Sequence, residues 1–261
     1  MMFWSALIIC RRQLEFGLVG RVVVASKVGQ NIDTSNAAWN FGGNVPDNFV
    51  NHIKHSVPLY AEGHDLICQL SDYFVSSEST VYEVGVSTGE LLRKVALRNK
   101  HRTNAKFIGL DVETAMTAKA REHTADVPSI QILDEDGRNF HFEKADLILS
   151  YYTMQFIPPR DRQQLFDKLY ETLNWGGALI MFEKVRAPDA RFQDISVNLY
   201  NEFKLAQGFD CEEIITKTRS LKGVLEPFST QGNLDLFARA GFQDVMTVAK
   251  YICFEGFLAI K

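Results

Sequence analysis

Residues 81–90 constrain the fold of this chain more than any other stretch of its sequence. An apolar run there ends in two glycines, Gly85 and Gly89, which flank a small polar loop, and a helical pattern follows. Glycine accepts left-handed backbone and brings no Cβ, so the spacing predicts a strand, a tight turn and a helix start, with room for a ligand against the bare backbone. A second apolar run ends in Asp111. Together the two runs are typical of the first βαβ unit of a nucleoside-binding α/β fold.

Strand and helix patterns alternate through much of the remaining chain. We expect strands at 81–84, 106–110, 130–133, 145–150 and 178–182, with helices at 91–98, 115–123 and 160–173 between them. Such alternation predicts parallel strands in one sheet with helices on both faces. Two further strands, at 245–250 and 252–260, follow each other closely enough to form an antiparallel pair. Two helices, at 47–55 and 66–74, precede the sheet and are separated by Pro58.

Two regions stand outside this alternation. Residues 190–208 and 212–225 have helical character and follow the fifth strand, where insertions cover the ligand crevice of an open α/β sheet. We expect this insertion, about 190–225, to be either a substrate lid or an oligomer surface. We expect residues 1–38 to be an N-terminal extension to a domain of residues 39–261. The extension could result from an upstream translation start, or it could be a disordered arm or a short membrane-associating segment. Its apolar run precedes two arginines, the reverse of a secretory signal, and is too short to span a bilayer.

Composition narrows the classes of function. The net charge of −4 does not favour a surface dedicated to nucleic acid, which needs clustered lysine and arginine. The four cysteines show no CxxC pairing and no histidine-rich neighbour. Neither a metal site nor a disulfide framework is therefore expected, and a reducing compartment is the default.

The glycine loop has a second interpretation. The spacing Gly85-x-Ser87-x-Gly89 also matches the nucleophile elbow of α/β-hydrolases, in which the serine attacks an ester. That mechanism requires an acid and then a histidine later in the chain, and the last histidine is His141. The early position of the histidines argues against a hydrolase. A structural turn without a ligand is the remaining alternative.

Several short motifs extend the pattern over residues 39–261. They are Trp39-x-Phe41, Ser56-Val-Pro-x-Tyr60, Gly85-x-Ser87-x-Gly89, Thr153-Met-Gln-Phe156, Leu173-Asn-x-Gly-Gly-Ala-Leu179, Glu183-Lys184, Phe203-Lys-x-Ala-x-Gly208 and Lys217-x-Arg-Ser-Leu221. With these motifs the chain resembles the class I S-adenosylmethionine-dependent methyltransferase superfamily. Within that superfamily it is most similar to the carboxy-S-adenosyl-L-methionine synthase family. The Ser-Val-Pro-x-Tyr and Lys-x-Arg-Ser-Leu segments are the more specific elements.

The resemblance implies a fold, a reaction and a cellular setting. The fold is a Rossmann-like, seven-stranded and mostly parallel sheet with an antiparallel C-terminal strand. The reaction moves a carboxyl group from prephenate to the methyl carbon of S-adenosyl-L-methionine, which gives carboxy-S-adenosyl-L-methionine and phenylpyruvate. The implied protein is a cytoplasmic homodimer that acts on small molecules, needs no metal, and contacts neither nucleic acid nor membrane directly. Its product serves a partner enzyme that modifies the wobble uridine of tRNA.

The resemblance also implies eight cofactor contacts near the ends of the first four strands: Gly85, Val86, Ser87, Asp111, Val112, Asp136, Gly137 and Ser150. The glycine loop would lie along the amino-acid part of S-adenosyl-L-methionine or its carboxylated form. Asp111 would accept hydrogen bonds from the two ribose hydroxyls, which suits a carboxylate at a strand end. Asp136 would meet the adenine amino group, and Ser150 stands where the family has an asparagine.

Tyr60 and Arg219 are the residues that the resemblance implies in both cofactor binding and the reaction. Tyr60 would close over the ligand from the N-terminal helices. The carboxylated cofactor carries an additional negative group, and the planar guanidinium of Arg219 can bind a carboxylate through paired hydrogen bonds.

Simpler roles remain open for the same kinds of residue. Asp111 could cap a helix, Asp136 could form a turn, Tyr60 could be a core aromatic and Arg219 a surface ion-pair partner. We expect Glu183 and Lys184, at the end of the fifth strand, to pair with each other without a chemical role. The alternative functions are methyl transfer to an unidentified small molecule and a non-catalytic cofactor-binding subunit.

Overall fold

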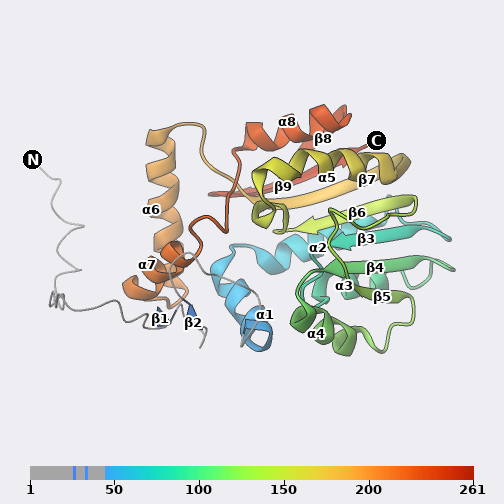
Figure 1. Cartoon of the computed structure of the whole chain (residues 1–261), viewed down its shortest axis with the longest axis horizontal. Coiled ribbons are helices and arrows are strands. Elements are labelled where there is room, and N and C mark those ends of the chain that lie inside the picture. The colour runs from blue at the N-terminus through green and yellow to red at the C-terminus, as the bar shows by residue number, and fades with distance from the viewer. Residues whose placement is uncertain (1–25, 28–32, 35–44) are drawn as a thin grey trace, which may run out of the picture.

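A computed structural model describes residues 26–27, 33–34 and 45–261 of the chain (Figure 1). Its strands are β1 (Ser26–Lys27), β2 (Asp33–Thr34), β3 (Thr80–Val84), β4 (Lys106–Asp111), β5 (Ile130–Asp134), β6 (Ala145–Tyr151), β7 (Leu173–Lys184), β8 (Asp244–Tyr251) and β9 (Phe254–Ile260). Its helices are α1 (Val45–Ser56), α2 (Tyr60–Ser71), α3 (Glu90–Arg98), α4 (Thr114–Thr124), α5 (Pro159–Thr172), α6 (Ala190–Ala206), α7 (Cys211–Ser220) and α8 (Thr230–Ala240), with a short 3₁₀ helix, η1 (Met154–Phe156).

The central sheet has seven strands in the order β5-β4-β3-β6-β7-β9-β8. The five strands from β5 to β7 run parallel to one another, whereas β9 is antiparallel to both β7 and β8. The predicted mostly parallel sheet with an antiparallel C-terminal strand is confirmed. Because the chain places β4 and β5 on one side of β3 and then β6 on the other, the strand order reverses between β3 and β6. Ligands of open α/β sheets bind at the carboxyl ends of the strands at such a point.

Apolar side chains alternate along the strands and fill two cores, one on each face of the sheet. Val81 and Leu147 point to the face that α2 and α3 cover, where they join Leu92 of α3. Tyr82 and Ile148, their chain neighbours, lie in the core of the opposite face, which α5 and α8 cover (Figure 1). The predicted three-layer architecture, with helices on both faces of the sheet, is therefore present.

Two helices differ from the sequence prediction. α2 begins at Tyr60, earlier than the predicted start at residue 66, because the residue that precedes it, Leu59, takes a left-handed conformation with φ 54° and provides no capping side chain. α8 was not predicted, although both of its ends carry familiar signals. Ser229 Oγ accepts a hydrogen bond from the Gly232 N–H at 3.0 Å, and Gly241 ends the helix with φ 116°.

The predicted helical insertion corresponds to α6 and α7, and α6 stands apart from the sheet at one end of the molecule (Figure 1). The short strands β1 and β2 pair with each other beside α7. The rest of the predicted N-terminal extension, together with Trp39 and Phe41, lies outside the described residues. Within the described ranges, no helix combines the length and apolar character that crossing a bilayer requires.

Candidate functional site

Three of the six non-glycine residues with positive φ among the described residues gather at one edge of the sheet, around the carboxyl ends of β3 and β6. Leu59 before α2, Ser87 after β3 and Tyr152 after β6 all take left-handed conformations, with φ of 54°, 50° and 60°. Each such residue costs on the order of 1 kcal/mol or more, and strained residues concentrate at functional sites. The strain coincides with the reversal of strand order, so we place the candidate site at this edge.

The glycine loop is shaped by its own packing. Gly85 has φ 81°, and a Cβ at this residue would lie 2.2 Å from Thr153 Oγ1 in the loop after β6. Gly89 has φ 76°, and a Cβ there would lie 3.2 Å from the Ala120 Cβ of α4. The backbone N–H groups of Gly85 and Val86 both donate to the Leu110 carbonyl, at 2.8 and 2.9 Å. The glycines are thus required by backbone conformation and close neighbours, in addition to any ligand.

Asp111 anchors the glycine loop to the end of β4. Its Oδ2 accepts the Ser87 N–H at 2.8 Å, and its Oδ1 accepts the Glu113 N–H at 3.0 Å. Burial raises the pKa of the Asp111 carboxyl, and the N–H groups of Glu113, Ser87 and Val112 oppose that rise. Each carboxylate oxygen keeps a further lone pair that can accept a ligand hydroxyl. Val112, beside it, is 61% exposed, an apolar surface that a bound ligand could cover.

Asp136 lies in the loop after β5 and is bound by a neighbouring arginine. Arg138 donates to Asp136 Oδ2 through Nη2 at 2.6 Å and through Nε at 2.9 Å. This ion pair lowers the pKa of the Asp136 carboxyl. Arg138 also bonds Asp161 at 2.9 Å. The geometry matches the turn-forming alternative, and the adenine contact of Asp136 stays a prediction.

Two further residues predicted to contact the cofactor, Gly137 and Ser150, are buried. Gly137 packs against β3, because a Cβ there would lie 3.1 Å from Val84 Cγ1. Ser150 is the penultimate residue of β6, opposite Met181 of β7. Its side chain is 1% exposed, and among the described residues its Oγ has no hydrogen-bond partner. The cofactor contact of Ser150 stays a prediction.

Tyr60 forms the first turn of α2 and is 9% exposed. Its ring centroid lies 5.2 Å from that of Tyr151 and 4.6 Å from that of His64. Burial raises the pKa of the Tyr60 hydroxyl well above its usual value, and the carboxyl groups of Glu90 and Glu83 raise it further. Tyr60 is thus packed as a core aromatic, yet it lies within electrostatic reach of two acids that flank the glycine loop.

Three buried groups around this loop were missed by the sequence analysis: Glu83, Glu90 and His64. Within the described chain, Glu83 Oε2, Glu90 Oε2 and His64 Nε2 are buried and have no hydrogen-bond partner. Glu90 Oε1 pairs with Lys54 at 3.6 Å and Lys94 at 3.5 Å. Burial lowers the pKa of His64 to about 3, so the imidazole is neutral. Glu90 could have been suspected from its place directly after Gly89, but His64 carries no such signal.

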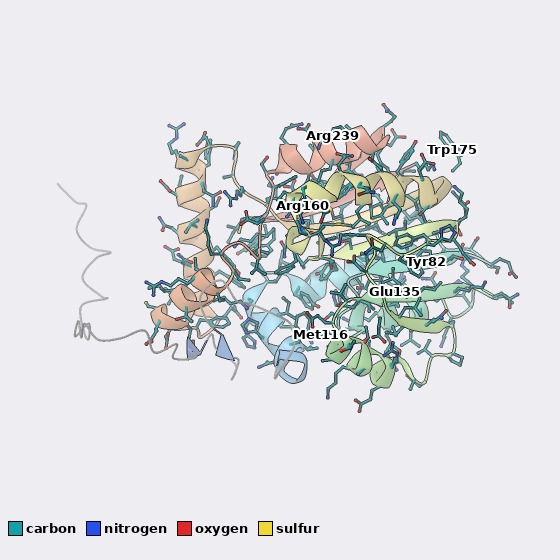
Figure 2. The ribbon with its side chains drawn as sticks, in the orientation of Figure 1. Tyr82, Met116, Glu135, Arg160, Trp175 and Arg239 are labelled. Carbon is teal, nitrogen blue, oxygen red and sulfur yellow. The ribbon has the colours of Figure 1, made fainter. Side chains whose placement is uncertain are left out.

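Arg219 lies in the last turn of α7 and is exposed. Two residues further on, Leu221 packs against Met116 of α4. Figure 2 shows Met116 where α4 faces α1. Ser87 Oγ donates to Met116 Sδ at 3.7 Å, so the Lys-x-Arg-Ser-Leu segment is anchored beside the glycine loop. The structure therefore brings this motif to the same edge of the sheet as Ser87.

The surroundings of Ser87 bear on the hydrolase alternative. The described residues place no histidine in hydrogen-bond contact with Ser87, and His123 Nδ1 instead lies 3.2 Å from the Thr88 carbonyl oxygen. The described chain thus contains no serine–histidine pair at Ser87 for a hydrolase. It also contains no group of three or more side chains suited to a metal ion.

Glu183 and Lys184 do not pair, so that prediction was wrong. Adjacent residues of a strand point to opposite faces of the sheet. Glu183 accepts the Met154 N–H of η1 at 3.0 Å, and burial raises its pKa to about 8. Lys184 lies on the other face, with Nζ 4.3 Å from the centroid of the Tyr200 ring.

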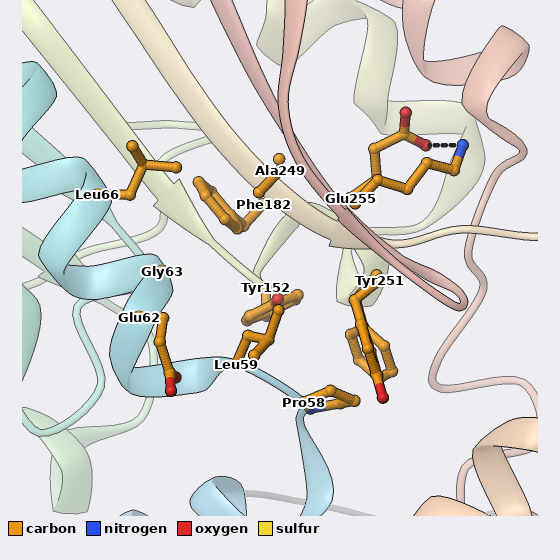
Figure 3. A pocket seen from close by; sticks show the side chains of 13 residues that line it. Pro58, Leu59, Glu62, Gly63, Leu66, Tyr152, Phe182, Ala249, Tyr251 and Glu255 are labelled. Atoms are coloured by element: carbon orange, nitrogen blue, oxygen red, sulfur yellow. Dashed lines mark hydrogen bonds and ion pairs between the residues drawn. The ribbon is translucent and has the colours of Figure 1, made fainter.

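A small cavity of about 110 Å³ lies beside the site, between the start of α2 and the β8–β9 hairpin (Figure 3). Leu59, Gly63, Tyr152 and Phe182 are among its lining residues. Sites for nucleoside-sized ligands usually enclose about 300 Å³ or more. This cavity is therefore too small to be the cofactor site itself.

Comparison with known proteins agrees with this geometry. A family model described as "Methyltransferase domain" matches residues 81–177. A carboxy-S-adenosyl-L-methionine synthase of Staphylococcus epidermidis is 37% identical over 224 residues, covering 85% of this chain and 97% of the relative. Proteins of the same name from Campylobacter lari and Escherichia coli are 34% and 33% identical over 85% of this chain, and cover 94% and 91% of the relatives.

Solved structures share the fold at low identity. A putative O-methyltransferase from Nostoc punctiforme has a TM-score of 0.57 at 18% identity, over 84% of this chain and 61% of that chain. Human N-acetylserotonin methyltransferase, solved in complex with S-adenosylmethionine, has a TM-score of 0.57 at 16% identity, over 84% of this chain and 56% of that chain. The chain therefore spans somewhat more than half the length of these two proteins, and the likeness concerns the fold alone.

The strand order, the glycine loop and these likenesses define a protein with the class I S-adenosylmethionine-dependent methyltransferase fold. The predicted fold class is confirmed. The relatives that are 31% to 37% identical over 85% of the chain all carry the name of one enzyme with that fold. The chain belongs to the carboxy-S-adenosyl-L-methionine synthase family.

Proposed function

We propose that this protein binds S-adenosyl-L-methionine and transfers a carboxyl group from prephenate to its methyl carbon, forming carboxy-S-adenosyl-L-methionine. The observation that carries the proposal is the set of relatives named for this product, which are 31% to 37% identical over 85% of the chain. The site agrees with it in kind, because the candidate residues gather at the edge of the sheet where the fold binds nucleosides.

The residues of this edge fit the cofactor. S-adenosyl-L-methionine is cationic at its sulfonium and its ammonium group, and when bound it supplies an activated methyl group. Glu83 and Glu90 each present a buried carboxylate oxygen without a hydrogen-bond partner among the described residues, which suits cationic groups. Asp111 keeps lone pairs for ribose hydroxyls, and exposed Val112 offers apolar surface beside them.

Asp111, Tyr60 and Arg219 would each have a separate role in the reaction. Asp111 fixes the Ser87 loop and so orients the cofactor tail. Tyr60 excludes water from the reacting centre, since its ring is already packed against Tyr151. Arg219 binds the new carboxylate through paired hydrogen bonds. The proposal keeps Tyr60 and Arg219 as the residues that decide between carboxyl and methyl transfer.

Product identification tests the proposed function. We expect the purified full-length chain, incubated with S-adenosyl-L-methionine and prephenate, to yield carboxy-S-adenosyl-L-methionine and phenylpyruvate by mass spectrometry. A reaction without prephenate is the control. Recovery of only unmodified cofactor or its demethylated product, with prephenate present, would refute carboxyl transfer and favour a methyltransferase or a non-catalytic subunit.

The proposal extends to the setting of the reaction. We place the protein in the cytoplasm, acting on small molecules without direct contact to nucleic acid. Its product would be consumed by a partner enzyme that modifies the wobble uridine of tRNA.

We also propose that the protein forms a homodimer through α6. This helix exposes apolar side chains on one stripe, with Phe192 48%, Ile195 52% and Leu199 45% exposed. The spacing of these residues places them on the same helix face. Contiguous exposed apolar side chains are typical of interaction surfaces. A second copy of the chain could cover this stripe, because a two-fold axis packs the same surface of two subunits against each other.

Ile195→Asp is expected to convert the dimer to a monomer, because it places a charge in the centre of an apolar interface. Sedimentation velocity at micromolar concentration measures the change. Asp194→Asn, at an exposed residue that lies off this apolar stripe on the same helix, is the control and should leave the dimer intact. A monomeric wild-type protein under these conditions would contradict the proposed dimer.

A further inference from the structure

Two lysines from distant parts of the chain share one tyrosine ring. Lys184 ends β7, and Lys204 lies in the last turn of α6. Their Nζ atoms lie 4.3 and 4.5 Å from the centroid of the Tyr200 ring. Lys204 is 7% exposed, which is rare for a lysine. The chain has therefore gathered two ammonium groups in a largely buried place.

No carboxylate of the described residues forms an ion pair with either ammonium group. Burial, together with the nearby charge of Lys184, lowers the pKa of Lys204 to about 8. The nearby Cys253 thiol is no counter-ion, because burial raises its pKa. Elsewhere the chain does pair a buried charge, since Lys250 lies 3.0 Å from the buried carboxylate of Glu255. The aromatic ring stabilises the two cations in part, but their charge remains uncompensated.

The lysines lie at the same edge of the sheet as the glycine loop. The Lys184 N–H donates to Gln155 Oε1 at 2.9 Å. Gln155 is two residues beyond Thr153, whose side chain fills the space beside Gly85. Aromatic rings also connect the two places, because Phe254 contacts Tyr200 at 5.2 Å and Tyr152 at 5.8 Å between centroids.

We propose that Lys184 and Lys204 form the subsite that binds the carboxylate of the carboxyl donor. The inference rests on the proposed function and adds to it the residues and the chemical class of the second substrate, an organic carboxylate. Two ammonium groups beside an aromatic ring suit such a ligand, because the ring packs against its carbon skeleton while the cations bind its charge. The subsite is separate from Arg219, which is assigned to the carboxylate of the product.

Substitution of each lysine by methionine tests the subsite, because methionine keeps most of the apolar stem. We expect Lys184→Met and Lys204→Met each to raise the KM for prephenate roughly 10- to 100-fold, with the Kd for S-adenosyl-L-methionine within about twofold of wild type. The melting temperature should stay level or rise, because an unpaired buried cation is removed. Lys204→Arg, which keeps the charge, should recover part of the affinity.

Arg191→Met is the matched control. Arg191 lies on the same helix with its guanidinium 5.5 Å from the Phe192 ring centroid, but it is exposed. Its loss should change neither KM nor melting temperature. A lower melting temperature of Lys204→Met with an unchanged KM would show that the lysines only fasten α6 to the core, and the subsite would be abandoned.

A binding measurement separates this inference from the proposed function. Calorimetric titration with prephenate requires no turnover. If the wild type binds prephenate without forming carboxylated product, the proposed function fails, and loss of that binding in Lys204→Met still supports the subsite. Equal binding by wild type and Lys204→Met, or no binding by the wild type, overturns it.

Discussion

Replacing Asp111 with asparagine is expected to weaken binding of S-adenosyl-L-methionine by about 10- to 100-fold. The two carboxylate oxygens of Asp111 accept N–H groups from Ser87 and Glu113, at 2.8 and 3.0 Å. An asparagine has one oxygen and one NH₂ group, so one of these N–H donors would face another donor. The glycine loop would lose its anchor, and the proposed contacts to the ribose hydroxyls would lose their charge. Isothermal titration with the cofactor measures the effect.

Asp134→Asn is the control that isolates the role of Asp111. Asp134 pairs with Asp111 in the register of β4 and β5, so it too is an acid at a strand end. Its carboxylate is exposed and bonded to Arg121 at 2.7 Å. Loss of such a surface ion pair costs about 0–1 kcal/mol of stability and should leave cofactor affinity unchanged. Wild-type affinity in Asp111→Asn would contradict the assigned role.

Arg219→Ala is expected to weaken binding of the carboxylated cofactor by about 10- to 100-fold and to leave the affinity for S-adenosyl-L-methionine nearly unchanged. The two ligands differ by one carboxylate, so a guanidinium that binds this group discriminates between them. Arg219 forms no ion pair with the described residues, so its donors are available for a ligand. Competitive titration of both ligands against the same variant gives the ratio directly.

Lys222→Ala provides the comparison for Arg219. Lys222 is exposed and donates its backbone N–H to the Arg219 carbonyl, so it belongs to the same turn. Its removal tests whether any positive charge in this turn attracts the carboxylated ligand. Equal losses of both ligands in Arg219→Ala would mean that Arg219 does not distinguish them.

The strands of the sheet could be predicted because their signal is local. Each central strand is a short apolar run that ends at a turn. A parallel strand that is buried on both faces of the sheet is apolar at nearly every residue, so such a run identifies it. Helix boundaries depended on less visible features. The start of α2 at Tyr60 follows a left-handed Leu59, a conformation that no sequence preference of leucine indicates. α8, in contrast, could have been found from Ser229 and Gly241.

The site divides in the same way. Asp111 and the glycine loop were predictable because a single βαβ unit brings them together. His64 and Glu90 come together because α2 and α3 pack side by side. Lys94 Nζ lies 3.4 Å from His64 Nδ1 and 3.5 Å from Glu90 Oε1. Lys184 and Lys204 come together because Tyr200 of α6 lies within reach of both, with its ring centroid 4.3 and 4.5 Å from their Nζ atoms. Such contacts depend on tertiary packing and leave no spacing in the sequence.

One hydrogen bond described by the structure joins the insertion to the N-terminal helices. The Tyr200 hydroxyl of α6 donates to the Ser56 carbonyl at 2.8 Å, and Ser56 ends α1 just before the turn that leads to Tyr60. If a donor bound at the two lysines restrains Tyr200, this hydrogen bond would transmit the restraint to the turn that precedes Tyr60. By thermodynamic reciprocity, whatever factor the donor gains from a bound cofactor, the cofactor gains from a bound donor. Each of the two substrates would thus increase the affinity of the protein for the other through the hydrogen bond of the Tyr200 hydroxyl.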